Sequence, residues 1–194
     1  MRELNTIQEK ILDRALFLIG KKGNYDVSVR DITREAGVNV NAINYYFGSK
    51  EQMIDQMEEF FIKNYLAAYS VLEEDMDDEE KLLIWANEVI EYNLQYPGIQ
   101  VILRDNLNSE RGGIMHQFLK DNAELFDQKV DKLMRDVLGA DEEFELVRML
   151  FNSGIFYPSS FIIDFKDDMA KINDKKFRIR YLEYLINKLK KRKE

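Results

Sequence analysis

The sequence contains no cysteine, one histidine and two prolines in 194 residues, and it has no long apolar run. The absence of cysteine excludes a disulfide framework and thiol catalysis. A single histidine without cysteine is a poor ligand set, so we expect neither a metal nor another cofactor. Every apolar run is shorter than the roughly 18 residues of a membrane span, and the first residues lack the apolar stretch of a signal peptide. We therefore expect a cytoplasmic protein without a membrane partner.

The charges are distributed unevenly along the chain. The net charge is −8, from 28 basic and 36 acidic residues. Residues 1–50 hold eight basic residues against six acidic ones, a balance of +2, and the remaining 20 and 30 give residues 51–194 a balance of −10. Charges further apart than a Debye length are largely screened, so the first 50 residues act locally as a mildly basic head.

Helical periodicity runs through the chain, and strand signals are scarce. Apolar residues recur at steps of three or four, as on one face of a helix. Ser28 and Ser49 are placed to cap helices, and the glycines that follow helical segments, Gly23, Gly37 and Gly48, are placed to end them. The pattern predicts an all-α fold of about nine helices, at residues 5–22, 28–36, 40–47, 50–72, 78–96, 97–106, 114–138, 142–165 and 174–193.

The segment 73–80, EEDMDDEE, has seven acids in eight residues. Acidic side chains suit the N-terminal end of a helix dipole and oppose its C-terminal end, so one helix should end here and another should begin near Asp77. A solvated turn between two helices is the expected structure. A divalent-cation site is the alternative, although the segment lacks the interleaved glycine of a calcium loop.

The segment 36–50, AGVNVNAINYYFGSK, places three asparagines and two tyrosines around a few apolar residues. Two short helices joined by a glycine-containing turn and packed on a third helix form a helix-turn-helix unit. Packing the apolar residues inward leaves Val40, Asn41, Asn44 and Tyr45 on the outer face of the second short helix. An asparagine amide can pair with an adenine edge in the major groove. The alternative is an ordinary helical hairpin with polar exposed residues.

The segment 11–53, ILDRALFLIGKKGNYDVSVRDITREAGVNVNAINYYFGSKEQM, resembles the DNA-binding head of TetR/AcrR-family transcriptional regulators. The matching elements are the AL of the first helix, the glycine and aromatic of KKGNY, and the runs VSVRDITREAGV and YYFGSKEQM. The resemblance implies a three-helix helix-turn-helix DNA-binding domain over residues 1–49. It also implies a larger helical effector-binding and dimerisation domain over residues 50–194.

The resemblance further implies which residues contact double-stranded DNA. Those expected at phosphates are Ser28, Asn39, Tyr45, Tyr46 and Lys50. Those expected to face the groove are Val40, Asn41 and Asn44. Asparagine stands at position 44, where the family commonly has tyrosine, and this favours a base contact there. Arg30 can reach a phosphate or remain exposed to solvent.

Dimerisation is expected from two C-terminal helices. The helix at 142–165 is apolar on nearly every side, which requires burial by its own domain and by a partner. Gly154 would permit a close helix approach, and the last helix has an apolar stripe. Both helices resemble the pair that forms the family's homodimer, with expected interface residues Val147, Phe151, Ile155, Phe161, Leu182, Leu185 and Leu189. The alternative is that both helices fill the core of a monomer.

A pocket for a small-molecule effector is implied mainly by the resemblance. The aromatic density of the body favours a mostly apolar effector. Candidate wall residues are Tyr65, Trp85, Val89, Tyr92, Phe118, Phe126, Phe151 and Phe156. Each of them can equally be an ordinary core residue.

The leading hypothesis is a ligand-responsive repressor that binds a palindromic operator as a dimer and releases it when an effector binds. An activator, or a regulator without an effector, is the nearest alternative. An all-helical enzyme would have to use carboxylates, lysines or tyrosines, and these form no recognisable catalytic arrangement. A helical dimerisation protein without DNA binding would leave the exposed amides and phenols unexplained.

Overall fold

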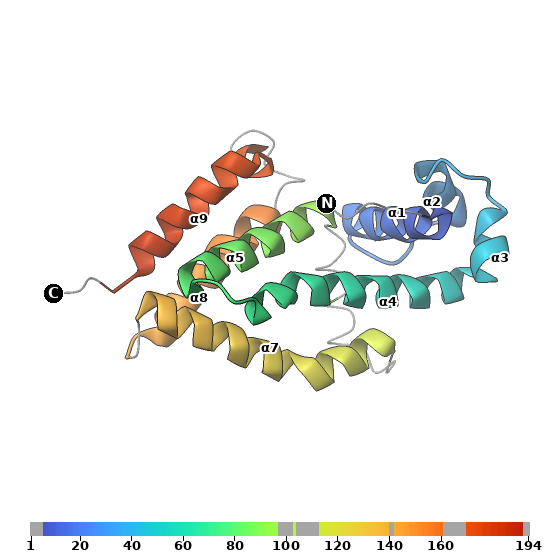
Figure 1. Cartoon of the computed structure of the whole chain (residues 1–194). Helices are drawn as coiled ribbons and strands as arrows, with labels where there is room; N and C mark the ends of the chain where they lie inside the picture. Colours follow the sequence, from blue (N-terminus) through green and yellow to red (C-terminus); the bar gives the residue numbers. More distant parts are fainter. Residues whose placement is uncertain (1–5, 97–102, 104–112, 140–141, 161–169, 192–194) are drawn as a thin grey trace. The chain divides into compact units, whose positions relative to one another are not determined.

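The computed structural model describes residues 6–96, 103, 113–139, 142–160 and 170–191 (Figure 1). All regular secondary structure in these residues is helical, which confirms the predicted all-α fold. No helix in these ranges is both long and apolar enough to cross a membrane. The elements are α1 (Ile7–Lys22), α2 (Val29–Glu35), α3 (Ala42–Phe47), α4 (Lys50–Tyr69), η1 (Ser70–Glu73), α5 (Asp78–Gln95), α7 (Ile114–Leu138), α8 (Phe144–Ser160), η2 (Ala170–Asn173) and α9 (Lys175–Leu189).

The observed helix bounds agree with the predicted ones to within a few residues. The helix predicted at 114–138 is found with those bounds as α7. The helix predicted at 50–72 ends as α4 at Tyr69 and continues as the short 3-10 helix η1. The helix predicted at 97–106 lies outside the described residues except for Leu103, which is helical, and residues 161–165 also lie outside them.

Side-chain caps fix the starts of the N-terminal helices. Ser28 Oγ accepts a hydrogen bond from the backbone nitrogen of Asp31 at 3.0 Å, as the sequence predicts for the start of α2. Ser49 Oγ accepts from the backbone nitrogen of Gln52 at 3.2 Å at the start of α4. Each cap satisfies a backbone N–H that has no partner within its own helix, and such caps stabilise a helix by about 1 kcal/mol.

The described residues divide into two compact units, which are described separately. The first consists of Met1–Tyr65 with Gln95–Asp121, and the second of Leu66–Leu94 with Asn122–Glu194. In the first unit, α1, α2, α3 and the first part of α4 each carry buried apolar residues. Its most deeply buried side chains include Ile11, Leu16, Ile19, Ile32, Ile43, Met53, Met57 and Phe61.

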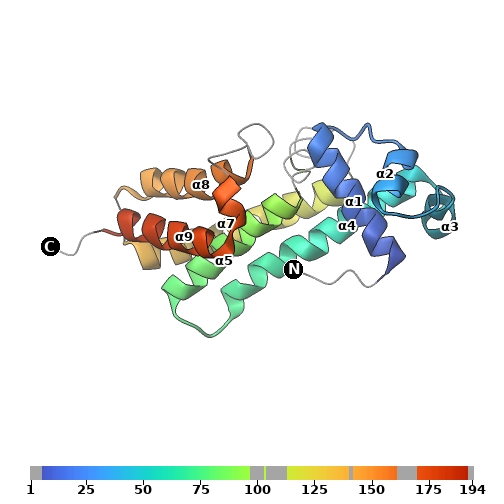
Figure 2. The same cartoon turned by 90° about the horizontal axis from the view of Figure 1, so that it is seen from above.

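The second unit has a core formed by α5, α8, α9 and the C-terminal part of α7. Its buried members include Leu82, Trp85, Ile90, Met134, Phe151, Ile155, Leu182 and Ile186. Figure 2 shows α8 and α9 side by side, and side chains of α9 pack directly against the backbone of α8 at Gly154. A Cβ at this position would lie 2.6 Å from a methyl of Leu185. The Tyr181 hydroxyl also donates to the Gly154 carbonyl at 2.7 Å, so the predicted close approach at Gly154 is confirmed.

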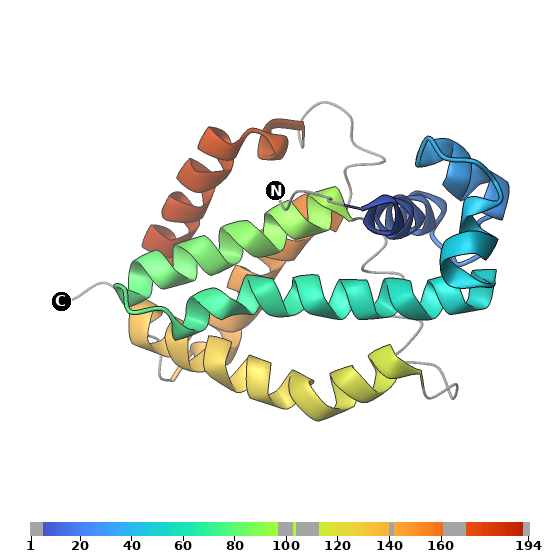
Figure 3. The same ribbon diagram turned by 45° about the vertical axis from the view of Figure 1, so that its right-hand side comes forward.

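A buried arginine ties α9 to α5, two helices that lie near each other in Figure 3. Arg178 is 3% exposed. Its Nε donates to Asn87 Oδ1 at 2.8 Å and its Nη2 donates to Glu91 at 2.7 Å. Its Nη1 donates to the carbonyl of Ile172 in η2 at 3.0 Å. A buried charge is tolerated when it is paired and hydrogen-bonded in this way.

We predict that Arg178→Ala lowers the free energy of unfolding by about 2 to 3 kcal/mol, because it leaves Asn87 and Glu91 without their partner. This loss of stability is smaller than for a fully buried ion pair, because the Glu91 side chain is 32% exposed. Urea unfolding followed by circular dichroism measures the change. Arg180→Ala removes an exposed arginine from the same helix and should have little effect. Equal losses in the two variants would contradict a structural role for the Arg178 network.

Candidate functional site

The turn between α2 and α3 is fixed by an asparagine. Asn39 Oδ1 accepts from the backbone nitrogen of Asn41 at 2.9 Å, and the Asn39 carbonyl accepts from the backbone nitrogen of Ala42 at 2.9 Å. The helix therefore begins at Ala42, and the predicted start at Val40 is wrong by two residues. The reason is that an asparagine side chain stabilises a turn by bonding the backbone two residues on. Val40 and Asn41 consequently lie in this turn and not in α3.

Two buried residues orient α3. Ile43 is 1% exposed and Phe47 is 4% exposed. Asn44 lies on the opposite side and is exposed, and Tyr45 is 81% exposed. The outward side of α3 and of its preceding turn thus carries the four residues that the sequence predicts there, Val40, Asn41, Asn44 and Tyr45. Their contact with DNA remains a prediction.

The residues expected at phosphates flank this surface in the sequence. Ser28 and Arg30 are exposed, whereas Tyr46 and Lys50 are partly buried. The Tyr46 ring packs edge-on against the ring of Tyr45, with centroids 4.8 Å apart. Such packing restricts the positions that the exposed phenol of Tyr45 can take. Ordering the side chain in advance lowers the entropy lost on binding.

The Ser28 hydroxyl is already engaged within the protein. It donates to Asp31 Oδ2 at 2.7 Å while it caps α2. This hydrogen bond, together with the nearby Arg34, holds the pKa of Asp31 below its usual value. A phosphate contact from Ser28 would therefore have to share or displace the Asp31 hydrogen bond.

Comparison with known proteins matches this N-terminal segment. Residues 11–57 match the sequence profile of bacterial regulatory proteins of the tetR family. Over 47 residues the chain is 43% identical to the HTH-type transcriptional regulator BetI of Agrobacterium fabrum, an alignment that covers 24% of this chain and 23% of BetI. Residues 11–57 therefore share the sequence signature of the TetR family, and the matched BetI segment is of the same kind.

Longer matches reach beyond the TetR segment at lower identity. An uncharacterized HTH-type transcriptional regulator of Xanthobacter autotrophicus is 23% identical over 137 residues, which cover 66% of this chain and 68% of that protein. The crystal structure of PfmR, a TetR family transcriptional regulator from Thermus thermophilus, aligns with a TM-score of 0.62 at 16% identity. That alignment covers 98% of this chain and 100% of PfmR, and at such identity it establishes a shared fold alone.

The residues predicted for an effector pocket fall into both units. Tyr65 and Phe118 lie in the first unit, with ring centroids 6.2 Å apart. Trp85, Val89 and Phe151 belong to the core of the second unit. Of the other three, also in the second unit, Tyr92 and Phe126 are partly buried, whereas Phe156 is 40% exposed. Their role in ligand binding remains a prediction.

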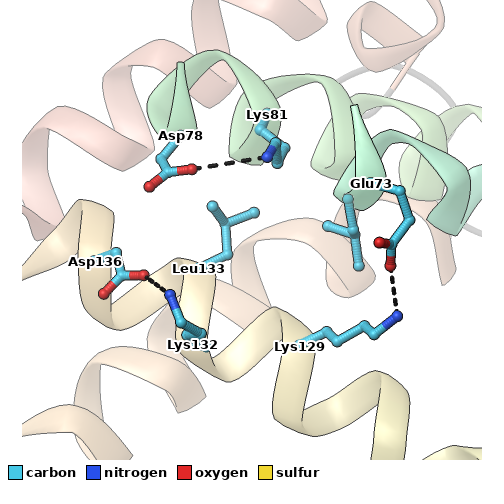
Figure 4. A pocket seen from close by; sticks show the side chains of 8 residues that line it. Glu73, Asp78, Lys81, Lys129, Lys132, Leu133 and Asp136 are labelled. Atoms are coloured by element: carbon cyan, nitrogen blue, oxygen red, sulfur yellow. Dashed lines mark hydrogen bonds and ion pairs between the residues drawn. The ribbon is translucent and has the colours of Figure 1, made fainter. Parts of the chain in front are cut away.

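A cavity of about 220 Å³ in the second unit has a different, charged lining (Figure 4). Lys129 pairs with Glu73 at 2.5 Å, Lys132 with Asp136 at 2.6 Å, and Lys81 with Asp78 at 3.8 Å. The hydrogen bond from Lys129 lowers the pKa of Glu73, and Asp136 raises the pKa of Lys132. Because every lysine faces a carboxylate, the lining is formally neutral. The lining residues are Leu72, Glu73, Asp78, Lys81, Lys129, Lys132, Leu133 and Asp136.

The acidic segment 73–80 forms the turn between η1 and α5, as predicted. Asp77 Oδ2 accepts from the backbone nitrogens of Glu79 at 3.0 Å and Glu80 at 3.2 Å and so caps α5. Glu73 and Asp78 pair with lysines. No group of three or more acidic or histidine side chains placed to hold a metal occurs in the described ranges.

The residues predicted for the dimer interface lie mostly inside the protomer. Phe151, Ile155 and Leu182 are each 0% exposed. Val147, Leu185 and Leu189 are partly buried, and Phe161 lies outside the described residues. The apolar residues that α8 exposes are Leu146, Met149 and Leu150, at 60%, 67% and 58%, followed by Phe156 and Tyr157. Met149 and Leu150 follow Leu146 by three and four residues, so these three lie on one face of α8, and none of them is among the interface residues predicted from the sequence.

We predict that neighbouring residues of α3 differ sharply in their effect on stability. Ile43→Ala should lower the free energy of unfolding by about 2 to 4 kcal/mol, because it leaves a cavity beneath α3. Asn44→Ala is the matched control at the next position and should change it by no more than about 0.5 kcal/mol, since Asn44 is exposed. Urea unfolding measures both variants. A large loss in Asn44→Ala would mean that its amide supports the fold and is not reserved for a partner.

Proposed function

We propose that the protein is a transcriptional repressor of the TetR type, which binds a palindromic operator as a homodimer and releases it when a small molecule binds the second unit. The observation that carries this proposal is the outward face of α3 within the TetR segment. This face exposes asparagine amides and a tyrosine phenol, while Ile43 and Phe47 on the opposite side of α3 are buried. Two of the matched proteins are named as HTH-type transcriptional regulators, which supports the same function.

The chemistry of this face suits a DNA duplex. An asparagine amide can donate to and accept from an adenine edge at once, and the major groove is wide enough for a helix. Tyrosine hydroxyls and lysine ammonium groups suit phosphate oxygens. The balance of +2 in residues 1–50 favours this approach even though the whole chain is acidic.

We predict that substitutions of base-reading residues and of phosphate-binding residues change DNA binding in different ways. Asn41→Ala and Asn44→Ala should each weaken binding to the preferred operator by about 1 to 3 kcal/mol and relax the preference at one base pair in each half-site. Lys50→Ala should weaken binding to all sequences similarly and reduce the salt dependence by about one phosphate contact per head. Affinities on single-base variants of a genomic fragment retained by the purified protein, at several salt concentrations, measure both effects.

The matched control for Lys50 is Lys63, an exposed lysine on the same helix α4. Lys63→Ala should leave both the affinity and its salt dependence unchanged. If both asparagine variants keep the base preferences of the parent protein, these amides do not read the sequence. If the purified protein retains no genomic fragment, the proposed function itself is wrong.

The homodimer is inferred from the exposed face of α8. Leu146, Met149 and Leu150 are more than half exposed on a helix whose opposite face is fully buried. On the adjacent helix α9, Phe177 and Tyr184 are 41% and 64% exposed. Apolar side chains gathered on one surface usually mark an interface. A two-fold axis would bring the same face of a second copy against it.

We predict that the double substitution Met149→Glu and Leu150→Glu gives monomers, because it places charges in the proposed interface. The monomers should lose operator affinity by about 100-fold or more, since each would bind only one half-site. Sedimentation measures the mass, and Ile114→Glu, which alters an exposed isoleucine at the start of α7, should remain dimeric. A double variant that remains dimeric would show that the interface lies elsewhere.

A further inference from the structure

Helix α5 carries two buried hydrogen-bond donors that have no acceptor among the described residues. Trp85 is 2% exposed and Asn93 is 6% exposed. Neither Trp85 Nε1 nor Asn93 Nδ2 has a hydrogen-bond partner within those residues. Leaving a buried N–H unpaired costs free energy, so each such donor in a folded protein calls for an explanation.

On the same helix, the buried amide of Asn87 has hydrogen-bond partners for both its oxygen and its nitrogen. Asn87 Oδ1 accepts from Arg178, and Asn87 Nδ2 donates to Glu88 at 3.3 Å. Asn87 therefore completes the network between α5 and α9. Trp85 and Asn93 are eight residues apart, with Val89 midway between them, so the three residues follow one side of α5 at steps of four. The two unpaired donors thus share a side of the helix that is separate from the Arg178 network.

The side chain that carries the first donor packs in a short chain of aromatic rings. The ring of Trp85 meets that of Tyr69 edge-on, with centroids 6.0 Å apart. Tyr69 in turn packs against Phe126, with centroids 4.6 Å apart. These rings come from the end of α4, from α5 and from α7, and all three belong to the second unit. A mostly apolar lining with a few fixed polar groups is the usual composition of a small-molecule site.

We propose that the effector is a neutral, mostly apolar molecule with hydrogen-bond acceptors, which accepts from Trp85 Nε1 and Asn93 Nδ2. This inference rests on the proposed function and specifies the ligand of its second unit. Both groups can only donate, so a matching ligand atom must be an acceptor such as a carbonyl or ether oxygen. A hydrocarbon of the same shape would leave both donors unpaired, and a site built on hydrogen bonds rejects such an analogue.

The charges of the second unit favour a neutral acceptor over a carboxylate. Arg178, the buried cation beside α5, is already paired with Glu91 at 2.7 Å. The donors at Trp85 and Asn93 carry no charge. An ionised carboxylate would therefore enter the interior without a counterion, at a large desolvation cost. The net charge of −10 over residues 51–194 also disfavours an anionic ligand.

Two matched pairs of probes test this inference on the full chain. Benzophenone and 1,1-diphenylethylene have nearly the same shape but differ in a carbonyl oxygen, and 2-nonanone and nonane differ in the same way. Equilibrium dialysis and the shift of Tm measure their binding. The parent protein should bind each ketone about tenfold more tightly than its hydrocarbon, the equivalent of one net hydrogen bond. Trp85→Phe and Asn93→Leu each place an apolar side chain where a donor stood, and for each ketone the variant that lacks the donor it uses should lose this preference.

Glu80→Gln is the matched control, because Glu80 is an exposed residue of the same helix. It should keep the full preference for ketones. Equal binding of ketone and hydrocarbon by the parent protein, or no binding of either member of both pairs, overturns the inference without the use of any variant. A preference that survives in both Trp85→Phe and Asn93→Leu overturns it as well. Retention of genomic DNA by the ligand-free protein is measured separately, so the failure of this inference is distinguishable from failure of the proposed function.

Discussion

The burial of Ile43 and Phe47 is the constraint on which the outward face of α3 depends. A helix of six residues is too short to be stable in water by itself, so its conformation relies on these two contacts with the core. Their burial also fixes the rotation of α3 about its axis. The exposure of Asn44 and Tyr45 is a direct consequence of that rotation. The chemistry of this surface is therefore set by two side chains that are themselves buried.

Much of the fold could be predicted because its signals are local. Serines at helix starts and regular apolar spacing are visible without any knowledge of tertiary contacts, and α7 was predicted with its observed bounds. The start of α3 could not be predicted in this way, because the Asn39 side chain bonds the backbone of Asn41 and forms a turn where the first helical turn was expected. Apolar periodicity cannot distinguish these two arrangements, since Val40 is compatible with both.

The candidate sites were predictable to different degrees. The outward residues of α3 followed from the spacing of its two apolar anchors. On α8 nearly every position is apolar, so the spacing does not say whether Phe151 or Leu150 faces the core, and the predicted set fell mainly on the buried face. Arg178 could not be recognised from the sequence, because arginine is ordinarily exposed and its partners Asn87 and Glu91 are distant in the chain.

The two faces of α8 are energetically separable. Leu146, Met149 and Leu150 are exposed in the protomer, whereas Phe151 and Ile155 are buried in its core. Substitutions on the first face can therefore accumulate without a loss of folding stability. After a gene duplication, two copies of such a protein could diverge on this face until each associates only with itself. In the proposed dimer, two regulators that share an ancestral core would then control separate genes without forming mixed dimers.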